Sequence, residues 1–391
     1  MLLISLLVFL LLLSVLVLIH EAGHYLAARY FGIKVEEFGF GFPPRALGKK
    51  IGETIYSINW LPIGGFVKLY GEDDAGGGRI EVKKKNEELT DTQRAFFSKP
   101  ASQRAAVVVA GVIMNTILAA LIFYTYFLIT NFTAEVPLLK PYHFFGMQQN
   151  NSTQVVITQV VKNSPAGKAG VKPYDRVLSV DNLPIQNATV FADYVKSHKG
   201  KKISLQLRNI ETDKSYAVSL IPRVNPPKNE GAMGVAFSST EFATLTYATP
   251  LQKVFSGFIH PLNLMLYNFY LIADRIGVSY QQKSTAPISE AVSGPVGIYS
   301  IVDIIIRIPN IRERILEILN LAGIISISLA VFNVLPIPAL DGGRLFFILI
   351  EWLTGHKIPA NWEAKVNMVG MVVLLGLIVL ITIKDIGQFF F

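Results

Sequence analysis

Residues 19–24 read Ile19-His20-Glu21-Ala22-Gly23-His24, an H-E-x-x-H motif that follows an apolar run beginning at residue 1. On a helix, His20 and His24 lie one turn apart on the same face, so both imidazoles can reach one metal ion. Glu21 is rotated by about 100° from His20, which suits a general base beside the metal. The motif predicts a zinc hydrolase with His20 and His24 as metal ligands and Glu21 as the catalytic base.

The segment that carries the motif is long enough to cross a membrane, because about 20 apolar residues span the ~30 Å hydrocarbon core. With Arg29 at the interface, His24 would lie about 7 Å deep and His20 about 13 Å deep. Ionisable groups at that depth are costly and indicate a functional site. The alternative is a short anchor whose polar end reaches headgroups or solvent. The spacing and Glu21 favour an enzyme that works within the bilayer.

The composition supports a membrane protein. The chain has 391 residues, 51% of them hydrophobic, and a mean hydropathy of +0.42. Its net charge of +8 comes from scattered basic residues, which excludes a nucleic-acid-binding stripe and favours positive charge beside membrane spans. There is no cysteine, so zinc must be held by nitrogen and oxygen ligands.

The pattern along the chain predicts a polytopic α-helical membrane protein with about four transmembrane helices, a β region on the cytoplasmic side and one extracytoplasmic domain. The expected divisions are a first transmembrane helix (1–31), a cytoplasmic-side loop with the β-hairpin region (32–104), a second transmembrane helix (105–130), an extracytoplasmic region (131–248), an amphipathic membrane-surface segment (249–314), a third transmembrane helix with a helix after it (315–355), and a fourth transmembrane helix with a short tail (356–391).

Two of these divisions contain predicted strands. In the loop, residues 54–60 and 64–70 read as a hairpin, and basic residues beside the adjoining spans indicate the cytoplasmic side. The aromatic and glycine-rich stretch 38–44 fits a small packed sheet or a sheet that enters the bilayer beside the metal. The extracytoplasmic region is expected to be mostly β, with strands at 154–158, 176–180, 202–207 and 216–220 and a short helix at 190–197. Residues 249–276 read as an amphipathic surface helix, with a span as the alternative.

Catalytic zinc takes three protein ligands, and a carboxylate must complete the set. Asp341 is the candidate, because it follows a helix break at Pro336 and Pro338 within an apolar segment. The alternative is that Asp341 caps a helix starting at Gly342.

Asn115 and Asn333 lie within apolar segments that are expected to cross the membrane. Asn333 could bind the substrate carbonyl or its oxyanion, or join two helices, and Asn115 is expected to join helices. The remaining histidines, none of which has a partner at metal spacing, are not expected to be ligands: His143, His198, His260 and His356.

These residues resemble the site-2 protease family of intramembrane zinc metalloproteases, in its bacterial regulator-of-sigma-E protease branch. The resemblance covers essentially the whole chain and rests on His20–His24 together with Asn333-Val334-Leu335-Pro336-Ile337-Pro338-Ala339-Leu340-Asp341-Gly342. It implies zinc ligation by His20, His24 and Asp341, a catalytic base at Glu21 and an active-site asparagine at Asn333.

Other stretches extend the resemblance. Residues 39–43 and the strands up to residue 70 are similar to the family's re-entrant β region, and residues 164–180 and 231–235 are similar to one PDZ domain of the bacterial type. Residues 294–298 match a stretch common in the branch. The chain departs from the family in having one PDZ-like unit where some members have two, Val112 where proline is common, and Arg344 where histidine is common. None of these departures changes a proposed ligand.

The function implied is zinc-dependent endoproteolysis within transmembrane segments, with Zn²⁺ as cofactor and single-span membrane proteins, such as anti-sigma factors or signal-peptide remnants, as substrates. The expected location is the inner (cytoplasmic) membrane, with the active site near the cytoplasmic side and no nucleic-acid partner. The alternatives are a non-catalytic PDZ scaffold with a structural metal site and a metal transporter. An intact Glu21 disfavours the scaffold, and the small number of spans disfavours the transporter.

Overall fold

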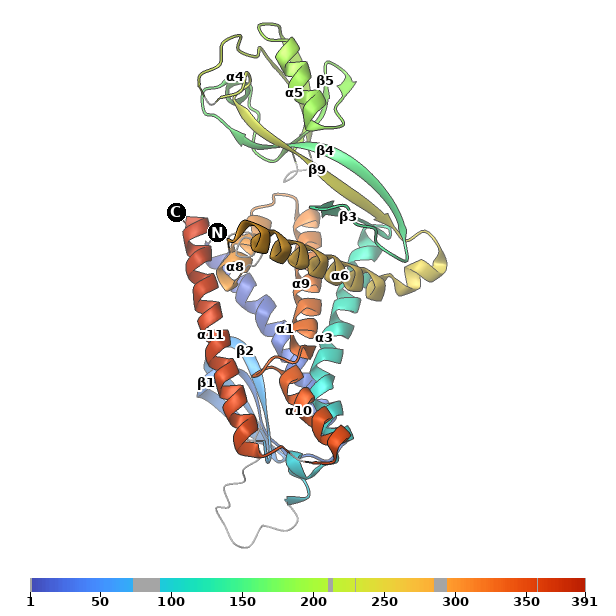
Figure 1. Cartoon of the computed structure of the whole chain (residues 1–391), viewed down its shortest axis with the longest axis vertical. Coiled ribbons are helices and arrows are strands. Elements are labelled where there is room, and N and C mark those ends of the chain that lie inside the picture. The colour runs from blue at the N-terminus through green and yellow to red at the C-terminus, as the bar shows by residue number, and fades with distance from the viewer. Residues whose placement is uncertain are drawn as a thin grey trace. The chain divides into compact units, whose positions relative to one another are not determined.

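The computed structural model describes residues 2–72, 92–209, 214–228, 230–284, 294–356 and 358–390. Four helices in this part of the chain are long and apolar enough to cross a membrane. They are α1 (Leu2–Tyr30), α3 (Ala101–Ile129), α9 (Ile311–Val334) and α11 (Ala360–Phe390), all visible in Figure 1. The number agrees with the prediction, and the protein combines these membrane helices with β-sheet.

The chain divides into two compact units. The first unit comprises Met1–Tyr126, Gly257–Arg307 and Leu316–Phe391, and the second comprises Phe127–Ser256 and Ile308–Ile315. Besides the four long helices, the first unit contains β1 (Val35–Ile51), β2 (Thr54–Leu69), η1 (Phe96–Ser98), most of α6 (Pro250–Gln282), α8 (Pro295–Ile306) and α10 (Asp341–Thr354).

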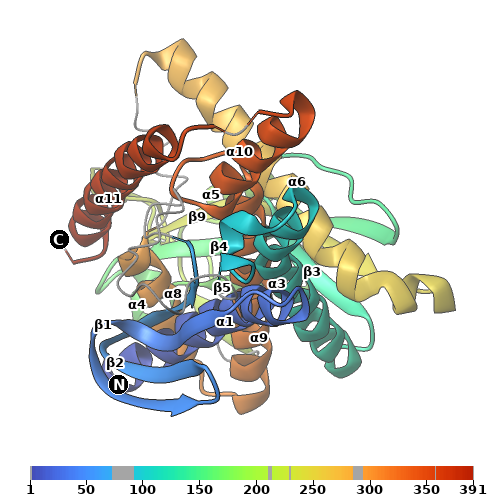
Figure 2. The same cartoon turned by 90° about the horizontal axis from the view of Figure 1, so that it is seen from below.

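β1 and β2 form an antiparallel sheet in which both strands fold back on themselves. Phe38 pairs with both Tyr56 and Val67, and Tyr56 also pairs with Lys49. The order across the sheet is therefore 45–51, 54–61, 35–40 and 64–69, so residues 64–69 form one edge. The sheet lies beside α1 (Figures 1 and 2). Residues 54–60 and 64–70 are strands as predicted, but their pairing as a hairpin is wrong, because residues 35–40 of β1 lie between them and pair with both. The sequence did not show this arrangement, since the aromatic and glycine-rich residues of β1 lack a simple alternation.

Apolar packing joins this sheet to α1 and α3. Buried side chains of α1, the turn after it, the sheet and α3 form one cluster: Ala28, Ile33, Val35, Leu69 and Val107. A mostly buried ion pair between Arg104 and Glu351, 2.6 Å long, connects α3 to α10. These contacts fix the positions of α1, α3 and α10 around the site described below.

The segment expected at 249–314 contains two helices. α6 has 33 residues with Pro261 inside, and it is not among the helices apolar enough to be a candidate span. In Figure 1 it crosses the direction of the four long helices. α8 is shorter and more apolar. Its first turn is capped by a side chain of α11, since Asp385 accepts hydrogen bonds from the backbone N–H groups of Gly294 and Gly297 at 2.8 and 2.9 Å.

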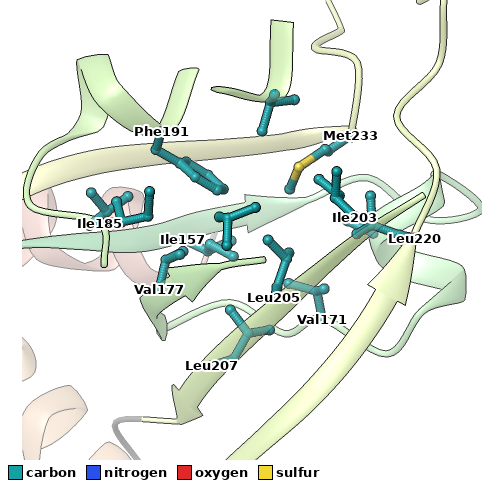
Figure 3. Packing of buried hydrophobic residues seen from close by; sticks show 14 residues of the cluster. Ile157, Val171, Val177, Ile185, Phe191, Ile203, Leu205, Leu207, Leu220 and Met233 are labelled. Atoms are coloured by element: carbon teal, nitrogen blue, oxygen red, sulfur yellow. The ribbon is translucent and has the colours of Figure 1, made fainter. Parts of the chain in front are cut away.

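The second unit is built around a seven-stranded antiparallel sheet in the order β3-β9-β4-β5-β7-β8, with β6 paired to β5. Its elements are β3 (Thr133–Leu138), β4 (Gln148–Val160), α4 (Pro165–Lys168), β5 (Asp175–Val180), β6 (Leu183–Pro184), α5 (Ala188–Ser197), β7 (Ile203–Asn209), β8 (Ser215–Leu220) and β9 (Val235–Thr246). Figure 3 shows Phe191 of α5 and Met233 facing Ile157 and Leu205 of the sheet.

The four strands and the helix expected here are present, with extensions that the sequence did not predict. β4 begins at Gln148, six residues before the expected strand, and β3 is an additional strand. Residues 148–154 are polar and show no apolar alternation, so a strand there depends on pairing with β9. The start of α5 is set by Asn187, whose side chain accepts a 2.9 Å hydrogen bond from Val190 N–H.

Candidate metal centre

The H-E-x-x-H motif lies on α1 in regular helix, as its spacing requires. His20 and His24 are each 7% exposed, and their rings meet edge to face with centroids 4.7 Å apart. Their Nε2 atoms are 3.1 Å apart. The helix therefore brings the two nitrogen atoms to one point inside the protein.

Asp341 reaches the same point from a distant part of the chain. The chain breaks after α9 and resumes as α10 at Asp341, whose carboxylate Oδ2 lies 3.0 Å from His20 Nε2 and 3.1 Å from His24 Nε2. The N-cap of α10 is Leu340, and no side chain caps the helix. The capping role considered for Asp341 is therefore wrong, because its carboxylate faces the histidines.

The three donor atoms have the spacing that zinc needs. They form a nearly equilateral triangle with edges of 3.0–3.1 Å. Tetrahedral zinc with ligands at about 2.0–2.1 Å places its donor atoms about 3.3 Å apart. His24 Nδ1 lies 2.8 Å from the backbone oxygen of Val107, so Nδ1 carries the proton and Nε2 presents a lone pair. A cation between these atoms would relieve the repulsion between the His24 lone pair and the Asp341 carboxylate, and the residues fit a zinc ion.

Asn115 on α3 contacts the other histidine. Its side chain is fully buried, with Nδ2 3.4 Å from His20 Nδ1, and its Oδ1 has no hydrogen-bond partner among the described residues. Rotating the amide by 180° exchanges these atoms, so that Oδ1 accepts from His20 Nδ1–H. Ser326 of α9 also donates to the Asn115 backbone oxygen at 2.8 Å. The sequence suggested only helix association for Asn115, whereas its side chain also lies against a candidate metal ligand.

Two glycines permit the close crossing of α1 and α3 at the site. A Cβ at Gly111 would lie 2.7 Å from His20 Cε1, and a Cβ at Gly23 would lie 2.7 Å from the Ala110 carbonyl carbon. Both distances are shorter than van der Waals contact, so a larger residue would force the helices or rings apart. Gly111 gave no functional signal in the sequence, because its effect depends on which helix crosses α1.

Glu21 and Asn333 border the triangle. The Glu21 carboxylate accepts a 3.1 Å hydrogen bond from Val67 N–H, at the edge of the β1–β2 sheet. Asn333 Nδ2 is 3.4 Å from His20 Nε2. All five predicted site residues therefore gather in one place, although they come from α1, the end of α9 and the start of α10.

Comparison with known proteins agrees with this geometry. The model of peptidase family M50 matches residues 8–377. The chain belongs to peptidase family M50, the site-2 protease family. A relative from Clostridium perfringens, assigned by name to the zinc metalloproteases, is 32% identical over 95% of this chain and 96% of its own length. The regulator of sigma-W protease RasP of Bacillus subtilis is 27% identical over 98% of both chains. The protein is thus a zinc-dependent protease.

The residues matched by the M50 model, 8–377, include all three candidate ligands: His20 and His24 on α1 and Asp341 at the start of α10. Among the residues that the structure describes, His20, His24 and Asp341 are the one group of histidine and acidic side chains close enough together to hold a metal ion. His260 packs instead against Phe123, with ring centroids 4.9 Å apart. Arg344, which follows Asp341 by one helical turn, forms an ion pair with Glu72.

Proposed function

We propose that the protein is an intramembrane endopeptidase that hydrolyses peptide bonds within the transmembrane segments of single-span membrane proteins. The observation that carries this proposal is the convergence of His20, His24 and Asp341 from helices that are apolar or adjoin an apolar span. These residues would hold the zinc ion of an M50 protease. Both histidines are buried, which supports a metal centre enclosed by the helices rather than one on the protein surface.

The neighbouring side chains have complementary roles in hydrolysis. When bound, zinc supplies Lewis acidity to the scissile carbonyl and the attacking water. Glu21 takes a proton from that water and passes it to the leaving amine. Asn333 donates a hydrogen bond to the carbonyl oxygen as negative charge develops on it.

A transmembrane helix hides its carbonyls in its own hydrogen bonds, so a substrate must unwind before cleavage. We propose that the unwound segment adds as a strand to residues 64–69, the sheet edge beside Glu21. Residues 55–58 are paired with a neighbouring strand on both sides and cannot accept a further strand. A cavity of about 620 Å³ lined by Phe66, Val67 and Arg344 supports substrate binding along this edge.

The second unit would select substrates as a PDZ-like domain. Support comes from a groove of about 300 Å³ between α5 and the start of β9, lined by Val195, Lys196 and Met233 among others. Such a groove could bind an extended peptide or exclude large ectodomains. We further propose an inner-membrane location, with the metal centre near the cytoplasmic side and the second unit extracytoplasmic, because basic residues flank the loop that contains β1 and β2.

The test is cleavage of a single-span model substrate by the purified full chain in detergent, with zinc content measured for every variant. Glu21→Gln should retain zinc and lose cleavage, and Asp341→Ala should lose both. The control is Glu135→Gln, a carboxylate 53% exposed in the second unit, which should behave as wild type. Cleavage by Glu21→Gln would refute the base assignment. Zinc binding without cleavage by the wild type would favour the non-catalytic PDZ scaffold.

A further inference from the structure

The connection between α9 and α10 contains a residue in an unfavourable conformation. Ala339, two residues before Asp341, has φ of +72°, in the left-handed region. For an alanine this conformation is disfavoured by about tenfold relative to the ordinary regions, because Cβ approaches the following carbonyl oxygen. The turn therefore persists only where surrounding contacts hold it.

Asn367 on α11 supplies such a contact. Its side chain is 5% exposed, and its Oδ1 accepts a 3.2 Å hydrogen bond from Ala339 N–H. One turn along the same helix, a Cβ at Gly370 would lie 2.8 Å from the Pro338 backbone oxygen. The glycine lets the backbone of α11 come close to the turn, within reach of the Asn367 side chain.

Asn367 is unusual within its helix. Among residues 361–387 of α11, only Asn367 and Asp385 are buried, and the apolar side chains are exposed or half-buried. Asp385 caps the start of α8. A polar side chain buried in a membrane helix is costly unless it makes a specific interaction. One partner of Asn367 is the N–H of Ala339, in the turn before a candidate metal ligand.

We propose that Asn367 is a positioning residue that holds Ala339 in its left-handed turn and thereby fixes the Asp341 carboxylate at the metal centre. This inference rests on the proposed role of Asp341 as a zinc ligand. If Ala339 returned to negative φ, the direction of the chain would change two residues before the ligand. Metal–ligand distances tolerate deviations of only about 0.2 Å, so a small rotation there would weaken metal binding.

Backbone hydrogen bonds on either side of Asp341 tie its position to the conformation of Ala339. Leu340 N–H donates to Ile337 O at 3.2 Å, and Gly343 N–H donates to Leu340 O at 3.0 Å. Asp341 lies between these two bonds, as the first residue of α10. A change at Ala339 is therefore transmitted to Asp341 through one intervening residue, without any rearrangement of α9.

The experiment measures zinc affinity by titrating the metal-free full chain against a competing chelator. Asn367→Ala should lower zinc affinity by about tenfold, the typical effect of losing a side chain that orients a ligand. Adding Ala339→Gly to Asn367→Ala should restore most of the affinity, because glycine adopts positive φ without strain. Val369→Ala, a truncation at a site 60% exposed on the same helix, should leave affinity unchanged.

Enzyme kinetics and the folding of the variants show whether Asn367 positions Asp341 or only fills space. Asn367→Ala should lower kcat at saturating zinc more than it changes KM, and the second substitution should reverse the loss. A lower zinc affinity that Ala339→Gly does not rescue would overturn the proposal, as would unchanged affinity in Asn367→Ala. If Asn367→Ala does not fold, folding of the double variant with near wild-type affinity supports the proposal, and its failure to fold overturns it. Unchanged zinc affinity in Asp341→Ala would instead show that the proposed function is at fault.

Discussion

Replacing Gly111 by alanine tests the metal-centre geometry with a single methyl group. The added Cβ would lie 2.7 Å from His20 Cε1 and would also contact the His24 ring. Carbon atoms pack at about 3.5–4.0 Å, so the ring or the helix must move by roughly 1 Å. This shift exceeds the tolerance of about 0.2 Å in metal–ligand distances.

The expected magnitude follows from that displacement. We expect zinc affinity to fall by about 10- to 100-fold, as when a ligand loses its support. Overpacking should also lower the free energy of unfolding of the metal-free protein by about 1–3 kcal/mol. Zinc affinity is measured by chelator competition, and unfolding by thermal denaturation in detergent.

A matched control separates crowding from the general effect of alanine in a membrane helix. Among the described residues, no atom outside the neighbouring backbone of α11 lies within 4 Å of a Cβ added at Gly376, so Gly376→Ala should leave zinc affinity unchanged. Wild-type zinc affinity in Gly111→Ala would refute the reasoning, because it would mean that the histidines and α3 are not in contact as described.

Three further predictions follow from other contacts. Asn115→Ala should lower zinc affinity by about tenfold, measured by chelator competition, because His20 Nδ1–H loses its acceptor. Burial and the neighbouring Asp175 raise the pKa of Tyr216 above its usual value of about 10. The stabilisation from this tyrosine is present below pH 10 and lost as the pH rises through the folded pKa, so the tyrosinate absorbance that Tyr216→Phe removes should titrate above pH 10. Asp385→Ala should lower the melting temperature, because the first turn of α8 loses its acceptor, and zinc affinity should be retained.

Much of the candidate site could be predicted from the sequence because its signals are local. The four-residue spacing of His20 and His24 implies one helical face, and the apolar run implies a membrane helix. Asp341 stood out because a charge after a proline-containing break in an apolar segment needs an explanation. The main strands of the second unit were also visible, since their apolar side chains alternate.

Contacts between helices could not be predicted in this way. Gly111 and Asn115 matter because α3 crosses α1 at the histidines, and no local pattern specifies that crossing. Asn367 reads as an ordinary polar residue in an apolar helix until the turn at Ala339 is seen next to it. The polar residues 148–154 likewise form a strand only because β9 pairs with them.

The sequence by itself determined the chemistry of this protein: two imidazoles and a carboxylate for a metal, a second carboxylate as base, and apolar segments that place them in a membrane. Residue type and short-range periodicity carry that information, because they depend on covalent geometry and solvation. The tertiary structure decided which distant groups hold the ligands in place. Such contacts arise from packing between elements that are far apart in the sequence. His20 and Asp341 are separated by 321 positions, and only folding brings His20 Nε2 and Asp341 Oδ2 to 3.0 Å from each other.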